Sequence, residues 1–340
     1  MQNHKKETLW SEDSWNRFEH NVRKEAISTK NDCQAWQTIV KASRKVMASY
    51  TTSFFIVTRF LPPSKRGMVE VIYAAVRYPD EVVDTFPLAA EECYDRLDRW
   101  EAGYELGLSC NTLLEALEKG VPSFVAAFTR VVLEKRIPHE YYRSFLAAMR
   151  HDIKPRSFKT LEDLIDNYIY GSAVVVGYFL AYIYGPSEDS KMEEVLACSR
   201  DMGIGLQLTN FLRDVNEDQR RGRLYLPLDM LGSAGVKANN PYDFCPLGEL
   251  THRKKVMKVI HQLAEISDSY YRKSLQRLEV FAPDCRVAIK ACIDVYAKLN
   301  KYITVSSDST SRRVSVSMRE KFGALPFSKY WRLPMAMFGY

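Results

Sequence analysis

Helical periodicity is the feature that most limits how this 340-residue chain can fold. From about residue 34 onward, apolar residues recur at the spacing of one helix face, about 3.6 residues per turn. The segments with this pattern are 34–56, 64–86, 90–105, 111–118, 122–133, 139–150, 161–184, 188–217, 251–278 and 284–304. With 15 glycines and 14 prolines, the chain has few of the residues that punctuate strands and turns. The sequence therefore predicts an all-α fold.

The domain organisation follows from where the helical pattern starts and stops. There is no repeat of fixed period and no break typical of two domains. Residues 219–250 are rich in Gly, Pro and Asn, and we predict a long loop there. We expect an N-terminal extension at 1–33, one large catalytic domain at 34–325 and a C-terminal tail at 326–340.

Composition narrows the class of protein. The net charge of +6 comes from dispersed basic residues, which disfavours nucleic-acid binding and leaves an anionic substrate or a negatively charged membrane surface open. Seven cysteines without a CxxC pair fit a reducing cytosol rather than a disulfide framework or zinc site. The polar N-terminus does not resemble a secretory signal, and the apolar run 173–184 is shorter than the roughly 20 residues of a membrane span. We expect a cytoplasmic location.

The stretch 76–86, VRYPDEVVDTF, places three carboxylates within five residues of a predicted helix. Asp80 and Asp84 are four residues apart and share a helix face, with Arg77 one turn and Tyr73 two turns earlier on the same side. Pro79 removes one helical hydrogen bond and crowds the preceding turn, so we expect a kink near Arg77–Asp80.

A second stretch, 203–227, also has two aspartates four residues apart on a predicted helix. Gln207, Asn210, Asp214 and Asp218 fall within one narrow stripe of a helix, beside an apolar face. A single Asp-x-x-x-Asp pair is usually a solvated surface. Two such pairs could instead hold Mg²⁺, which takes oxygen ligands and is usually bound by one or two carboxylates together with substrate phosphates. Arginines would complement the phosphate oxygens.

The stretch QLTNFLRDVNEDQRRGRLYLP (207–227) resembles the signature of the squalene/phytoene synthase family. TTSFFIVTRFLP (51–62), IYAAVRYPDEVVD (72–84), DNYIYGSAVVVG (166–177) and residues 270–296 are similar to other landmarks of that family, in the same order. The resemblance covers roughly residues 40 to 325. It implies an isoprenoid synthase fold around a central cavity and head-to-head joining of two prenyl diphosphates.

The resemblance also implies site residues. Asp80, Asp84, Asp214 and Asp218 would be catalytic and, with Asn210, would bind Mg²⁺, with Mn²⁺ as an alternative. The implied substrate-binding residues are Ser53, Phe54, Tyr73, Arg77, Tyr168, Gln207, Arg213, Tyr225, Tyr296 and Arg313. The chain departs from the family pattern where Glu81 replaces a common Asp and where Val174 replaces a common Gly and adds bulk to one wall.

Three functions remain open. We expect phytoene formation from two geranylgeranyl diphosphates through a cyclopropyl (prephytoene) diphosphate, without NADPH, and the small side chain of Thr58 favours these longer chains. The main alternative is a squalene or dehydrosqualene synthase that uses two farnesyl diphosphates. A non-catalytic assembly factor is the third, and the intact aspartates argue against it. The basic, aromatic tail either associates peripherally with a membrane or packs on the protein itself.

Overall fold

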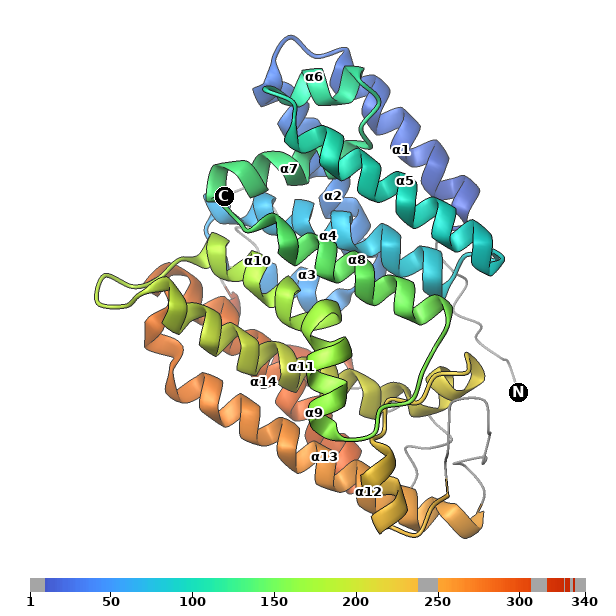
Figure 1. Ribbon diagram of the computed structural model, residues 1–340. Helices are drawn as coiled ribbons and strands as arrows, with labels where there is room; N and C mark the ends of the chain where they lie inside the picture. Colours follow the sequence, from blue (N-terminus) through green and yellow to red (C-terminus); the bar gives the residue numbers. More distant parts are fainter. Residues whose placement is uncertain (1–9, 238–249, 307–316, 327, 331–332, 334–340) are drawn as a thin grey trace. The chain divides into compact units, whose positions relative to one another are not determined.

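The structure is a computed structural model that describes residues 10–237, 250–306, 317–326, 328–330 and 333. Helices make up its regular structure, and these residues include no β-strand (Figure 1). In chain order the elements are α1 Glu12–Ile27, α2 Asp32–Tyr50, α3 Thr52–Thr58, α4 Pro63–Asp84, α5 Ala90–Leu108, α6 Leu113–Glu118, α7 Ser123–Lys135, α8 His139–Ile153, α9 Leu161–Leu164, the π-helix η1 Ile165–Val174, α10 Val175–Tyr184, α11 Met192–Arg220, α12 Leu228–Ser233, α13 Leu250–Gln276, the 3₁₀-helix η2 Leu278–Val280, α14 Pro283–Val305 and α15 Met318–Ala324. The predicted all-α class is confirmed.

Backbone contacts divide the chain into two compact units, Met1–Ile153 and Lys154–Tyr340. The first unit is organised around α4, which packs against α2, α5, α7 and α8. α4 begins at Pro63, whose fixed φ suits the first helical position. One face of α4 is buried in the unit, with Val71, Ala74 and Ala75 fully covered. That face anchors the helix that carries the first aspartate pair.

The second unit is organised around α11, which packs against α10, η1, α13 and α14. Small residues let these helices approach closely. A Cβ atom added at Gly203 would lie 3.2 Å from the Cα of Val174, and one added at Gly205 would lie 2.9 Å from the Tyr271 ring. Tyr271 and Ser267 of α13 both donate hydrogen bonds to the Gly205 carbonyl, at 2.8 and 2.9 Å. These contacts fix the helix that carries the second aspartate pair.

The structure corrects some predicted boundaries. The segment 34–56 is two helices, because the Thr51 side chain accepts a hydrogen bond from the Phe54 amide and caps the start of α3. The predicted loop 219–250 is wrong in part, since α12 lies within it and α11 reaches Arg220. Leu231 of α12 is fully buried, so packing overrides the local loop-like composition. Residues 238–249 of that segment lie outside the described residues, and α1 lies within the predicted N-terminal extension.

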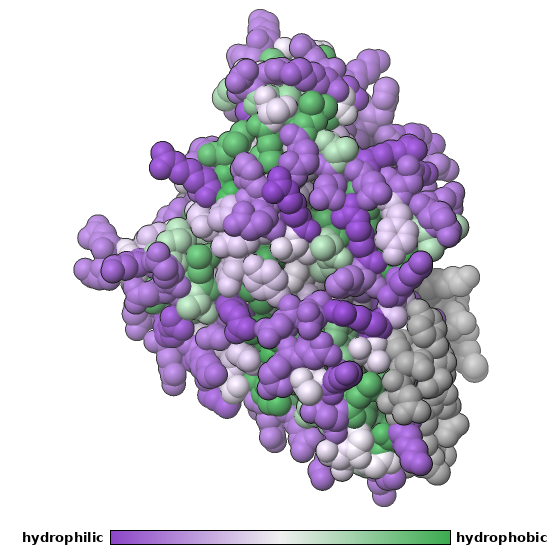
Figure 2. Space-filling model, viewed as in Figure 1, coloured by the Kyte–Doolittle hydropathy of each residue, from purple (hydrophilic) through white to green (hydrophobic). Residues whose placement is uncertain are grey.

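One run of the described residues is long and apolar enough, by length and composition alone, to cross a membrane. It is Leu161–Tyr184, with 24 residues, in which an 18-residue window has a mean hydropathy of 1.3. The run is longer than the apolar run 173–184 because α9 and η1 precede α10 without a break. The run packs against α11 and 56% of that window is buried, which fits a core helix, and a core helix passes the same test. Figure 2 shows a face dominated by hydrophilic side chains, with apolar ones in narrower bands.

Candidate functional site

The C-terminal end of α4 carries several negative charges, and negative charge is unfavourable at this end of a helix. Asp80, Glu81 and Asp84 lie in its last turns, and no basic residue lies in the last turn. The backbone carbonyls give a helix C-terminus a partial negative charge, so carboxylates there raise the free energy unless cations lie nearby. This end of α4 is therefore suited to bind a cation.

Arg77 supplies one positive charge. Its Nη1 lies 2.6 Å from a carboxylate oxygen of Asp80, and its Nη2 forms an ion pair with Glu81, whose side chain is only 1% exposed. Burial lowers the pKa of the Arg77 guanidinium, but the nearby Asp80, Tyr73, Tyr50 and Asp84 outweigh burial, and the pKa is raised from its ordinary value. The structure thus brings Tyr73, Arg77, Asp80 and Asp84 together, as predicted.

Tyr50, the last residue of α2, belongs to the same cluster and was missed by sequence reasoning. Its ring lies under the Arg77 guanidinium, 4.2 Å from the ring centre to the guanidinium carbon. Its hydroxyl oxygen is buried without a hydrogen-bond partner. Burial raises the Tyr50 pKa to about 12, with Arg77 opposing the shift. Spacing could not have found Tyr50, because it lies on another helix. Ser53 and Phe54, which were predicted, are half-buried on α3.

The second cluster lies on the last turns of α11. Arg213 Nε donates to both carboxylate oxygens of Asp214, at 2.9 and 3.0 Å. Burial lowers the pKa of Arg213, but the bonded Asp214, together with Tyr296 and Asp218, raises it above its ordinary value. Three predicted residues, Asp214, Asp218 and Tyr296, therefore act electrostatically on the guanidinium of a fourth, Arg213. This cluster pairs an arginine with acidic groups, as on α4.

Asn210 tests whether this cluster suits a metal ion. Its amide Nδ2 has only a long contact of 3.5 Å to Gln207 Oε1. Its oxygen Oδ1 is buried and accepts no hydrogen bond, which costs free energy unless a ligand is bound there. An amide oxygen and two carboxylates are hard ligands of the type that Mg²⁺ takes. Among the described residues, no group of three or more His, Cys, Asp or Glu side chains is arranged so that it could hold a metal ion by itself.

An aromatic stack lies beside this cluster. Tyr225 stacks on Phe211, with ring centres 4.1 Å apart, and its hydroxyl lies 3.0 Å from that of Tyr168. Tyr168 is carried by the π-helix η1, a geometry that is rare and frequent at functional sites. Both tyrosines were predicted site residues, and both are buried. Arg313 was also predicted and lies outside the described residues.

Two residues that sequence reasoning linked to the substrate chain are packed in the interior of their own units. Thr58 is 3% exposed, and its hydroxyl donates to the Phe55 carbonyl at 2.8 Å. Val174 is fully buried in a cluster with Ile204 and Leu208. The added bulk of Val174 therefore fills a packed core between η1 and α11.

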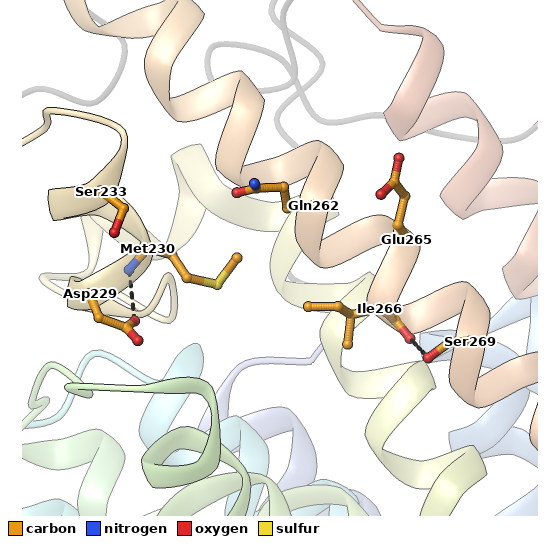
Figure 3. Close-up of a pocket in the computed structure, with 7 residues that line it drawn as sticks. All are labelled: Asp229, Met230, Ser233, Gln262, Glu265, Ile266 and Ser269. Atoms are coloured by element: carbon orange, nitrogen blue, oxygen red, sulfur yellow. Dashed lines mark hydrogen bonds between the residues drawn. The ribbon is translucent and has the colours of Figure 1, made fainter.

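A cavity of about 550 Å³ in the second unit lies between α12 and α13 (Figure 3). Its lining is mixed: Met230 and Ile266 are apolar, and the other lining residues, Asp229, Ser233, Gln262, Glu265 and Ser269, are polar or charged. A neighbouring cavity of about 610 Å³ shares Gln262 and Glu265 and is lined by several cationic side chains of α13. None of the predicted site residues lines either cavity.

The sequence of this chain matches a known protein family along most of its length. The profile of the family described as squalene/phytoene synthase matches residues 47–320. A 15-cis-phytoene synthase of Paracoccus sp. (strain N81106 / MBIC 01143) is 30% identical over 295 residues, which cover 84% of this chain and 90% of that protein. The chloroplastic phytoene synthase 1 of Arabidopsis thaliana is 30% identical over 290 residues, and the match spans 64% of that longer protein.

Solved structures of a dehydrosqualene synthase and a squalene synthase have the same fold. A dehydrosqualene synthase in complex with a ligand has a TM-score of 0.67 at 22% identity, over 90% of this chain and 99% of that chain. The squalene synthase HpnC from Alicyclobacillus acidocaldarius has a TM-score of 0.64 at 20% identity, over 78% of this chain and 93% of that one. The expected isoprenoid synthase fold is confirmed.

Proposed function

The chain belongs to the squalene/phytoene synthase family, and on that premise we propose that it is a prenyltransferase that joins two geranylgeranyl diphosphates head to head. The first step forms a cyclopropyl diphosphate, prephytoene diphosphate, and releases one diphosphate and one proton. The second step releases the other diphosphate and one proton and gives phytoene. The observation that carries this proposal is the 30% identity to a 15-cis-phytoene synthase, over 84% of this chain and 90% of that protein, in a chain that keeps both aspartate pairs.

The two acidic clusters bind the diphosphate groups in this proposal. Asp80 and Asp84 in the first unit would hold Mg²⁺, and so would Asn210, Asp214 and Asp218 in the second unit. When bound, Mg²⁺ withdraws negative charge from a departing diphosphate. Arg77 and Arg213 present guanidinium donors suited to phosphate oxygens. Their ion pairs with Asp80 and Asp214 keep these guanidinium groups oriented.

In this proposal the aromatic stack has a different role from the acidic clusters, which concerns the carbocation. Loss of diphosphate from an allylic substrate leaves a carbocation, which water would quench. The faces of Tyr168, Phe211 and Tyr225 are electron-rich surfaces that attract a cation. Their burial excludes water from the same region. We propose that these rings lie against the prenyl chain during the reaction.

The squalene and dehydrosqualene synthases, which use two farnesyl diphosphates, provide the second candidate function. Solved structures with those names share the fold, but at 22% identity or less, so they carry less weight for the substrate than the curated phytoene synthases. Reductive squalene formation needs NADPH, whereas phytoene formation does not.

Product analysis tests this choice. Purified protein is incubated with Mg²⁺ and either geranylgeranyl or farnesyl diphosphate, with and without NADPH, and the hydrocarbons are identified by mass. We expect phytoene from the C20 substrate, no dependence on NADPH, and loss of product with a chelator that Mg²⁺ or Mn²⁺ reverses. A C30 product alone would contradict the choice of substrate. Consumption of neither diphosphate would contradict the enzyme itself.

We also propose peripheral association with a membrane surface, where such lipid substrates are held. The support is a pair of exposed aromatic rings near the C-terminus. The rings of Phe322 and Tyr330 are 38% and 59% exposed. Lys329 packs against both rings but is buried, and its Nζ donates to the Phe322 carbonyl. Exposed aromatic rings favour the membrane interface. Co-sedimentation with anionic vesicles tests this, and a Phe322→Ser/Tyr330→Ser variant that sediments as well as the parent would contradict it.

A further inference from the structure

Pro79 lies within α4, one residue before Asp80, and it leaves one backbone carbonyl without its helical partner. In an α-helix the amide of residue 79 would donate to the carbonyl of Ala75, and proline has no amide hydrogen. Ala75 is fully buried, so water is not available to its carbonyl. The helix nevertheless continues through Pro79 to Asp84.

Tyr142 of α8 provides the missing donor. Its hydroxyl donates to the Ala75 carbonyl oxygen at 2.8 Å. The same hydroxyl accepts a hydrogen bond from Trp100 Nε1 of α5 at 2.7 Å. Tyr142 is fully buried, so the bond that Trp100 donates orients the Tyr142 hydroxyl toward Ala75 without help from solvent.

Trp100 also supports the residue before the proline. Proline disfavours helical geometry at the preceding position, here Tyr78. The Tyr78 ring stacks on Trp100 with ring centres 4.3 Å apart and 27° between planes. Trp100 thus packs on Tyr78 and orients Tyr142. Together these contacts compensate for both local defects that Pro79 causes, the missing hydrogen bond and the disfavoured backbone.

We propose that Tyr142, oriented by Trp100, is a positioning residue that holds the last turn of α4 and thereby sets the orientation of Asp80 and Asp84. Tyr142 does not touch the substrate in this proposal and acts only through the backbone of α4. The proposal rests on the proposed function, in which these two aspartates bind the magnesium diphosphate. In this proposal the Tyr142 hydroxyl is needed because Pro79 has no amide hydrogen to donate to Ala75. The hydroxyl should therefore be dispensable once Pro79 is replaced.

The test is a cycle of three variants, Tyr142→Phe, Pro79→Ala and the double variant. The readout is binding of inorganic pyrophosphate in the presence of Mg²⁺, measured by calorimetry, together with kcat and KM. We expect Tyr142→Phe to weaken binding and lower kcat by about tenfold, as is typical when a residue that supports a metal ligand is lost. In the double variant residue 79 regains an amide hydrogen for Ala75, so binding should return to that of Pro79→Ala alone.

Tyr104→Phe is the matched control. Tyr104 lies in the same aromatic cluster, 4.6 Å from Tyr142 between ring centres, and its hydroxyl is equally buried but has no hydrogen-bond partner. Removing that hydroxyl should leave pyrophosphate binding unchanged. If Tyr142→Phe does not fold, Trp100→Phe carries the test, because it keeps the Tyr142 hydroxyl and removes the bond that orients it, while it replaces the indole that stacks on Tyr78 with a smaller ring. We then expect weaker binding that Pro79→Ala again relieves.

Two results would overturn the proposal. One is unchanged binding and kcat in folded Tyr142→Phe, and the other is a loss that Pro79→Ala does not reduce. Asp80→Asn separates this from a failure of the proposed function. If Asp80→Asn abolishes magnesium-dependent pyrophosphate binding while Tyr142→Phe does not change it, only the positioning role is wrong. If Asp80→Asn and Tyr142→Phe both leave pyrophosphate binding intact, α4 does not bind the diphosphate and both proposals are wrong.

Discussion

The guanidinium of Arg77 lies over the ring of Tyr50, with 4.2 Å from its central carbon to the ring centre. Arg77 is on α4 and Tyr50 is the last residue of α2. The arginine that pairs with Asp80 is therefore held from two helices, by carboxylates of its own helix and by an aromatic face of another. This arrangement reduces the freedom of a long side chain before any phosphate arrives.

Tyr50 gives the first prediction, in which the ring rather than the hydroxyl matters. Tyr50→Leu removes the aromatic face and should lower kcat/KM by roughly 2–30-fold, the equivalent of about 0.5–2 kcal/mol for a cation–π contact. Tyr50→Phe keeps the ring and should stay within about twofold of the parent, because the hydroxyl has no hydrogen-bond partner. Steady-state kinetics checks both variants. Equal losses in the two would contradict this role for the ring.

Close helix packing at Gly205 gives the second prediction. An alanine Cβ at this position would lie 2.9 Å from Tyr271 Cε1, and the buried Tyr271 ring is held by its hydrogen bond to the Gly205 carbonyl. Overpacking of this kind costs about 1–3 kcal/mol, so Gly205→Ala should lower the Tm. Gly232→Ala is the control, since nothing lies within 4 Å of its added Cβ. It should leave the Tm unchanged or raise it, and the same fall in both variants would exclude the packing explanation.

Glu19 gives the third prediction, which concerns pH. Its Oε1 accepts hydrogen bonds from the Ser123 amide and hydroxyl, at 2.7 and 3.1 Å, and links α1 to the start of α7. Burial raises the Glu19 pKa from 4.5 to about 7, although Ser123 and Arg23 oppose the shift. Because the folded protein favours the neutral form, this contribution to stability is complete below pH 4.5 and is lost as the pH rises through about 7, at most ~3 kcal/mol.

Glu19→Gln removes this titration and keeps an oxygen acceptor for Ser123. The variant should therefore gain stability relative to the parent between pH 5 and pH 8, as measured by urea unfolding at both values. A difference between parent and variant that does not change with pH would show that burial does not shift this carboxyl group.

The helices were predictable from the sequence because their apolar faces repeat along the chain. The segments 64–86 and 284–304 correspond closely to α4 and α14. The boundary at Thr51 was missed because a side-chain cap ends one helix and starts the next within a continuous periodic pattern. The helix α12 was missed because burial of Leu231 in the tertiary structure overrides a local sequence that resembles a loop.

The candidate site was predictable only where its residues share a helix. Asp80 and Asp84, like Asp214 and Asp218, follow the spacing of one helix face, and the structure places each pair beside an arginine. Tyr50 and Tyr142 could not be predicted, because their contacts join residues on different helices, and Tyr142 is 67 positions from Ala75. The sequence did indicate a local defect in α4, since Pro79 has no amide hydrogen for the Ala75 carbonyl.

The central claim is that both acidic clusters bind the magnesium-bound diphosphate substrate. The most direct test titrates an unreactive thio analogue of geranylgeranyl diphosphate in the presence of Mg²⁺, by calorimetry, into the parent, Asp80→Asn, Asp214→Asn and Asp98→Asn. Asp98 is a control whose carboxylate is 66% exposed in an ion pair with Arg150, and such pairs contribute little. We predict that Asp80→Asn and Asp214→Asn each weaken binding at least ~10-fold and that Asp98→Asn does not. Parent-like affinity in either of the first two variants would contradict the account.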